Sequence, residues 1–285
     1  MASDDAYENE WKGANTGLNP MFGDWQHRFK FAPVPYGDGG AKLADFRKAI
    51  RGALTNNFFY TSEVRLEITL YLDIQTVLET SETADLDNYT KSILDGLKGP
   101  DGILFDDTQV QTLIISYLNS YGRDSPYFDV ALSAAPDDFA VKPVSFYEMP
   151  DRLWYPHGVS MWTDGGIDEQ PDDLHYLGLL ILEAMSSVKA NTRHLLRQMG
   201  MDRLGAYQRA LPLSSSARGF HRSRIDPGFE MFDRKSWRAQ FEAWRSGYEH
   251  KEKIEETEKI LTDVRQNYES MAVALAGIPA NKSSS

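Results

Sequence analysis

The most regular pattern in the chain is an alternation that runs from Val64 to Leu72. Apolar residues occupy every second position, and charged or hydroxyl-bearing residues occupy the positions between them. Successive side chains of a β-strand point to opposite faces, so a period of two predicts a strand that is buried on one face only. The chain must therefore build a sheet and cover one side of it.

Further patterns around this strand predict a mixed first half. Residues 28–31 alternate before two prolines and predict a short strand, and apolar residues recur every three or four positions over 43–54, as in an amphipathic helix. A short helix is expected from Asn88 to a stop at Gly99. Residues 110–118 are apolar on both faces, as in a central strand, and 127–134 alternate again. The predicted fold class is α+β, a small mixed β-sheet with flanking helices.

The second half has a different character. Prolines and tryptophans without clear periodicity predict irregular structure over 136–171, whereas apolar stripes predict one long helix from Asp172 and another from about Asp233 to Ala276. We therefore expect four consecutive segments: an acidic N-terminal tail (1–26), a mixed domain (27–135), an irregular linker (136–171) and a mainly α-helical C-terminal region (172–285).

Composition narrows the location and the cofactors. The chain has no cysteine, no long apolar stretch and no basic leader. Neither a membrane partner nor export is therefore predicted. We expect an intracellular, cytoplasmic protein, associated with the nucleoid if its source is bacterial or phage. Any metal must be held by oxygen or imidazole. A Gly-rich phosphate loop is absent, so no nucleotide cofactor is expected.

The net charge of −12 is unevenly distributed. Residues 189–245 hold 12 basic and 5 acidic side chains, a local net charge of +7, although the chain as a whole is acidic. Phosphate contacts usually come from such clusters. The candidate DNA-binding residues are Arg193, Arg197, Arg218, Arg222 and Arg224. A basic face that is merely solvated explains the same cluster.

Four carboxylates are candidates for a metal site. Asp85 and Asp87 are two residues apart in a segment expected to be extended, and Asp106 and Asp107 stand at the turn before a predicted strand. Carboxylates brought close together repel each other, and a hard divalent cation relieves that repulsion. The expected ion is Mg²⁺, or Mn²⁺ in its place, which activates water and a phosphoryl group for displacement. Lys91 follows Asp87 by one helical turn and is suited to stabilising negative charge on a phosphate.

Structural roles explain the same residues one at a time. Asp87 suits a helix N-cap, and Lys91 is a favourable helical partner of both Asp87 and Asp95. An Asp-Asp pair is also common in turns. The paired carboxylates favour a metal site only when they are considered together.

A two-part motif adds a resemblance. The stretch Asp85-Leu-Asp-Asn-Tyr-Thr-Lys91 and the later Asp106-Asp-Thr-Gln-Val110 resemble the signature of RusA-type Holliday junction resolvases, over roughly residues 27–135. In that family the equivalents of Asp85, Asp87 and Asp107 are the metal-binding catalytic carboxylates, and a functional lysine falls on Lys91. Asp106 is a further candidate ligand. Acidic residues stand just before Asp85, where the family has basic ones, and the second half has no counterpart in its small members.

The resemblance implies a magnesium-dependent endodeoxyribonuclease. Such an enzyme acts as a homodimer and resolves a four-way DNA junction by paired nicks in recombination or repair. An alternative is a DNA-binding or assembly protein that does not cleave but keeps a nuclease-like domain. A third possibility retains the nuclease and changes its substrate to flaps, forks or plain duplex.

Overall fold

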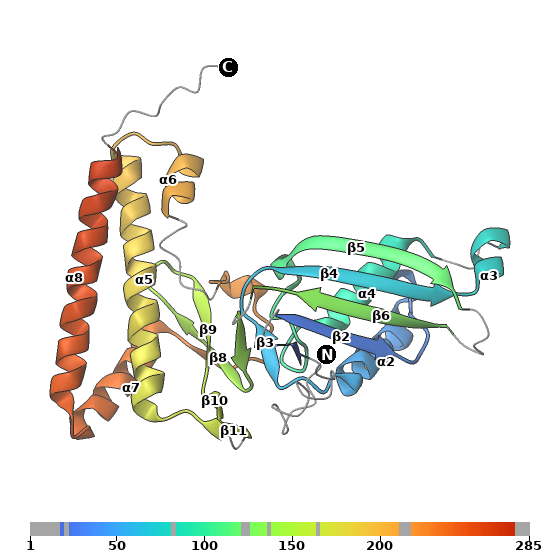
Figure 1. Ribbon diagram of the computed structural model, residues 1–285, viewed down its shortest axis with the longest axis horizontal. Coiled ribbons are helices and arrows are strands. Elements are labelled where there is room, and N and C mark those ends of the chain that lie inside the picture. Colours follow the sequence, from blue (N-terminus) through green and yellow to red (C-terminus); the bar gives the residue numbers. More distant parts are fainter. Residues whose placement is uncertain are drawn as a thin grey trace, which may run out of the picture. The chain divides into compact units, whose positions relative to one another are not determined.

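The computed structural model of the protein describes residues 18–19, 23–80, 84–120, 126–135, 138–163, 166–210 and 218–276. Most of the predicted acidic tail lies outside these residues. The chain divides into two compact units (Figure 1). The described residues of the first fall within Met1–Val144, Gly158–Glu169 and Ser223–Phe229, and those of the second within Ser145–His157, Gln170–Arg222 and Glu230–Ser285.

The alternating segment forms β4 (Val64–Leu72) in a five-stranded sheet of the first unit. Its apolar side chains are all buried, as the period of two predicts. β4 pairs in parallel with β5 and antiparallel with β6, and the strand order is β1-β2-β6-β4-β5. The other strands are β1 (Leu18–Asn19), β2 (Asp24–Phe29), β5 (Val110–Asn119) and β6 (Tyr127–Ser133).

Helices α2 (Gly40–Ala53) and α4 (Leu86–Leu97) pack against the buried face of this sheet (Figure 1). The two helices approach closely at Gly96, where an added Cβ would lie 2.6 Å from the Cδ1 atom of Ile50. A larger residue there would push the helices apart. The predicted mixed sheet with flanking helices is confirmed, and α4 is the element that positions the motif.

The expectation that residues 110–118 form a central strand is wrong. β5 is at an edge of the sheet among the described strands and pairs with β4. Leu113, Ile114, Tyr117 and Leu118 are 38–51% exposed, although they are apolar. The sequence pattern records that both faces are apolar, but it does not record whether this chain or another molecule covers them.

Short elements complete the first unit. A three-residue helix η1 (Tyr36–Asp38) precedes α2, and α3 (Ile74–Glu79) follows β4. β3 (Phe58–Tyr60) pairs with β7 (Phe139–Val141), and β10 (Ser160–Thr163) pairs with β11 (Gly166–Glu169).

The irregular structure expected over 136–171 is also wrong, because several strands lie there. β7, β10 and β11 of the first unit lie in this range, and so do β8 (Val144–Glu148) and β9 (Trp154–Gly158), which form a three-stranded sheet of the second unit together with β12 (Met231–Phe232). These strands have two to five residues, too few for a period of two to be recognised in sequence. Two of them, β7 and β12, pair with β3 and β8, segments that lie far away in the chain.

Helices make up the rest of the second unit. They are α5 (Asp172–Gln198), α6 (Arg203–Ala210), α7 (Arg234–Gly247) and α8 (Lys251–Ala276), with a short η4 (Arg222–Arg224). Trp237 and Phe241 of α7 are fully buried against α5 residues such as Leu179. The single helix predicted from Asp233 to Ala276 is wrong, since the backbone becomes extended at Tyr248. The apolar stripe changes phase at this break.

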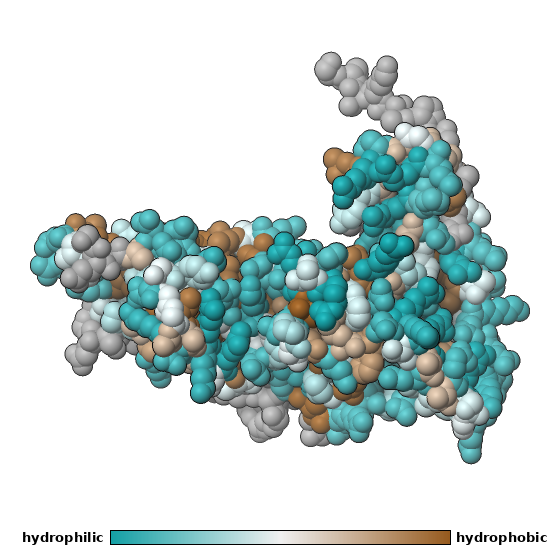
Figure 2. Space-filling view, turned by 180° about the vertical axis from the view of Figure 1, so that it is seen from behind, coloured by the Kyte–Doolittle hydropathy of each residue, from teal (hydrophilic) through white to brown (hydrophobic). Residues whose placement is uncertain are grey.

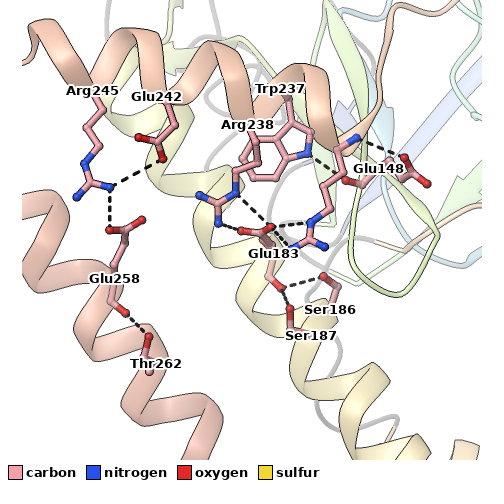
Figure 3. A network of polar contacts seen from close by, with 11 residues as sticks. Glu148, Glu183, Ser186, Ser187, Trp237, Arg238, Glu242, Arg245, Glu258 and Thr262 are labelled. Carbon is pink, nitrogen blue, oxygen red and sulfur yellow. Dashed lines mark hydrogen bonds and ion pairs between the residues drawn. The ribbon is translucent and has the colours of Figure 1, made fainter.

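A polar network ties α5 to α7 inside the second unit (Figure 3). The carboxylate of Glu183 is almost fully buried and forms ion pairs with Arg234 and Arg238. The indole Nε1 of Trp237 donates to the backbone oxygen of Glu148 at 3.0 Å. A buried charge persists only when such partners compensate it, so these arginines are structural.

No helix in the described part of the chain is long and apolar enough to cross a bilayer. Hydrophilic residues dominate the face shown in Figure 2, with hydrophobic residues in smaller patches.

Candidate metal and DNA site

The first part of the motif lies at the start of α4. Asp85 is the N-cap residue, yet its side chain makes no capping hydrogen bond, and Asp87 lies in the first turn. Both side chains are exposed. The positive end of the helix dipole stabilises negative charge at this position. Two hard oxygen ligands are therefore available to a cation from solvent, and Asp87 is not the N-cap that its sequence context suggests.

Lys91 follows Asp87 by one turn of α4 and is exposed. Its Nζ atom lies 3.7 Å from the centroid of the Tyr36 ring in η1. An ammonium over an aromatic face is weakly stabilised and still keeps donors for a phosphate. This contact holds Lys91 next to the α4 N-terminus.

The second part of the motif lies near the other end of α4. Asp107 opens η2 (Asp107–Gln109), and its Oδ2 atom is 2.9 Å from the Nζ atom of Lys98, the C-cap residue of α4. The same ammonium is 3.0 Å from Oδ1 of Asp95. Burial disfavours the charge on Lys98, but the hydrogen bonds that its ammonium donates to Asp107 and Asp95 outweigh this effect, so the pKa of Lys98 is raised.

The carboxylates do not converge within one copy of the chain. Asp87 and Asp95 are eight residues apart in α4, about 12 Å at roughly 1.5 Å per residue. Asp107 lies at the Asp95 end of α4, because both carboxylates pair with the ammonium of Lys98. Among the residues that the structure describes, no group of three or more His, Asp or Glu side chains is placed to hold a metal. The sequence expectation that one short unit gathers Asp85, Asp87 and Asp107 is therefore not met within a single chain.

Asp106 has a structural environment. It is 6% exposed and caps η2, and its Oδ1 atom accepts hydrogen bonds from the backbone N (3.1 Å) and the hydroxyl (2.5 Å) of Thr108. These bonds engage an oxygen that a cation would need. Asp106 therefore fits a capping role better than the ligand role that its sequence position allows.

The buried side chain of Gln109 connects two backbone segments, a role that the sequence pattern does not indicate. Its Oε1 atom accepts from the backbone nitrogens of Phe105 (2.7 Å) and Asp106 (3.2 Å), and its Nε2 atom donates to the backbone oxygens of Tyr60 (2.8 Å) and Ser62 (3.0 Å). The amide uses two acceptor and two donor positions. It fixes the Asp106-Asp107 turn to the segment between β3 and β4.

The five arginines predicted to bind DNA lie in α5, in the segment 218–222 and in η4. Arg193 lies over the Tyr207 ring, Arg218 over Phe220 and Arg222 over Trp154, all in the second unit. Arg197 is exposed near the end of α5, and Arg224 is exposed at the end of η4 in the first unit. Three of the five arginines therefore lie over aromatic rings.

The comparison with protein families agrees with the motif. Residues 39–132 match the model of the family described as endodeoxyribonuclease RusA. The match spans β4, α4, η2, β5 and nearly all of β6, and it includes both parts of the motif. None of the curated proteins compared with the chain matches it. The expected resemblance of the N-terminal half is confirmed, and the matched segment is similar to an endodeoxyribonuclease family.

Proposed function

We propose that the protein is a divalent-cation-dependent endodeoxyribonuclease that nicks branched DNA, with a four-way junction as its first substrate. The observation that carries this proposal is the two-part motif, which lies in the family-matched segment and leaves Asp85 and Asp87 exposed beside Lys91. Mg²⁺, or Mn²⁺ in its place, suits these carboxylate oxygens. Recombination or repair is the setting in which such a substrate arises.

The roles of the side chains follow from their chemistry. Asp85, Asp87 and Asp107 are the proposed ligands, and a bound cation would supply activation of water and of the phosphodiester. Lys91 is placed to donate to a non-bridging phosphate oxygen, where negative charge increases in the transition state. The cation–π contact with Tyr36 restricts where the ammonium of Lys91 can move.

The separation of Asp87 from Asp107 supports a homodimer. If one copy brings Asp85 and Asp87 and another brings Asp107, all three carboxylates meet where the copies join. The apolar edge strand β5 begins directly after η2 and is a candidate for the joining surface. A twofold axis would then create two equivalent sites, as paired nicks require.

The test of the activity is a nicking assay on a synthetic four-way junction with Mg²⁺. We expect Asp87→Asn to lower the nicking rate by roughly a thousandfold, equivalent to about 4 kcal/mol of barrier. Binding of the junction should be nearly unchanged, because Asp87 is an acid rather than a phosphate-binding base. A panel of flaps, forks and plain duplex then ranks the substrates.

A non-cleaving DNA-binding protein is the second candidate, and one observation favours it. Among the residues that the structure describes, a single copy does not gather the carboxylates needed for a cation site. Wild-type protein that binds the junction as a dimer but never cuts any DNA of the panel, with either Mg²⁺ or Mn²⁺, would establish this candidate and remove the nuclease.

The test of the dimer uses light scattering. Leu118 is 51% exposed on β5, so Leu118→Asp should spare the fold and favour the monomer by placing a charge at an apolar interface. Leu78→Asp is the matched control, because Leu78 is 69% exposed on α3. A dimer that is unaffected by Leu118→Asp would exclude β5 as the joining surface.

A further inference from the structure

The segment 218–222 of the second unit is built onto β9. Trp154 and Phe220 exchange two backbone hydrogen bonds of 2.9 and 2.8 Å, and Phe220 is 2% exposed against Phe146. Gly219 allows this close approach, since an added Cβ would lie 2.6 Å from the Cζ atom of Tyr155. Residues 218 and 222 are therefore mounted on a fixed base.

Three arginines lie on aromatic rings at this base. The guanidinium carbon of Arg218 is 5.4 Å from the Phe220 centroid, that of Arg222 is 5.7 Å from Trp154, and that of Arg193 is 5.6 Å from Tyr207. We call these six residues the arginine–aromatic patch. Arg193 of α5 also acts electrostatically on Tyr155, the ring that Gly219 contacts. The two parts of the patch are therefore neighbours.

Two arginines of the patch, Arg193 and Arg222, differ from the arginines of α7. Arg234 and Arg238 share ion pairs with the buried Glu183, and Arg245 pairs with Glu258 at 3.1 Å. Within the described part of the chain, Arg193 and Arg222 form no ion pair with a carboxylate. Stacking holds a guanidinium in place without consuming its charge or its N–H edge.

The chemistry of the patch selects its ligand. A guanidinium presents a planar fork of donors that matches a phosphate, and several such forks match a chain of phosphates. Trp154 is partly exposed and Tyr207 is 43% exposed, so each also offers ring surface to an unpaired base. We propose that the arginine–aromatic patch binds the phosphodiester backbone of a DNA strand, apart from the metal centre. This inference rests on the proposed function for the identity of its ligand.

The experiment measures binding of a four-way junction to the full chain by fluorescence anisotropy, in EDTA and over a series of salt concentrations. Each phosphate contact contributes about 0.9 to the slope of log K against log salt. We expect Arg218→Gln/Arg222→Gln to reduce that slope by about two and to weaken binding roughly tenfold at moderate salt. Lys235→Gln/Lys259→Gln is the matched control, because it removes two exposed positive charges from α7 and α8. The control should keep the wild-type slope.

An unchanged slope in a folded patch variant overturns the inference, and so does an equal loss in the control. Thermal melting reports whether each variant is folded. If the double variant unfolds, Arg222→Gln replaces it, since this side chain is exposed and its loss should reduce the slope by about one.

Failure of this inference is distinguishable from failure of the nuclease proposal. The binding assay contains no divalent cation. If the protein binds through the patch but never cuts, this inference stands and the nuclease proposal is wrong. If the protein cuts the junction and the patch variant binds with the wild-type slope, the nuclease proposal stands and the inference about the patch is wrong.

Discussion

The two parts of the motif are built in opposite ways. At 85–91 the carboxylates are exposed at a helix N-terminus, and the Asp85 side chain makes no capping hydrogen bond. At 104–110 most of the turn is buried, and Asp106 and Gln109 are committed to hydrogen bonds that shape it. Of the two carboxylates in this turn, Asp107 is the one that remains partly exposed, at 38% of its side chain. A sequence motif can therefore combine residues kept for chemistry with residues kept for the framework that presents them.

The largest effect on nicking is expected when a substitution in the first part of the motif and one in the second part are carried by different copies of the chain. Asp87→Asn and Asp107→Asn should each abolish nicking. A mixture of the two, allowed to exchange subunits, should regain it. If Asp87 of one copy works with Asp107 of the other, half of the sites in a mixed dimer carry no substitution. Gel analysis should show cutting of one strand of the junction.

The same mixture tests the alternative arrangement directly. If Asp87 and Asp107 of one copy act together, each site of a mixed dimer keeps one substitution and the mixture stays inactive. Mixing Asp85→Asn with Asp87→Asn is the control, because both residues lie at the same end of α4 and no intact site is expected.

A smaller effect is expected from Gln109 in the second part. Gln109→Met should lower the free energy of unfolding by about 3 kcal/mol, because it leaves buried backbone groups at both ends of the amide without partners. Gln111→Met is the control, since Gln111 is exposed on β5. Urea denaturation measures both. Equal stability of the two variants would mean that Gln109 does not hold the turn.

The smallest effect concerns Lys142, whose Nζ donates to the Gly102 backbone oxygen at 2.7 Å in the loop before this turn. Burial lowers the pKa of Lys142 from 10.5 to about 8. Below that pKa the folded protein carries a buried charge, and between about 8 and 10.5 the unfolded chain binds more protons. Stability should therefore rise with pH across this window.

The comparison with Lys142→Met isolates this contribution, because other groups also titrate at alkaline pH. The difference in unfolding free energy between wild type and variant should shift in favour of wild type as the pH rises from 8 to 10.5. A difference that is independent of pH would show that Lys142 titrates normally in the folded protein.

The sequence by itself determined the elements with long, regular patterns. β4 and the helix of residues 40–53 follow from hydrophobic period, because one face of each must be buried whatever surrounds it. The motif identified Asp85, Asp87, Lys91 and Asp107 by residue type and spacing, and the matched family model agrees with that resemblance. The function assigned to these residues remains a proposal.

Only the tertiary structure decided what depends on distant partners. The short strands β7 and β12 exist because they pair with β3 and β8, which lie far away in the chain, and the edge position of β5 follows from strand order. The length of α4 separates Asp87 from Asp107, and Lys98 pairs with Asp107 because the chain turns back after that helix. Local patterns record which side chains can be buried or charged, whereas the distance between two charges is fixed only when the whole chain has folded.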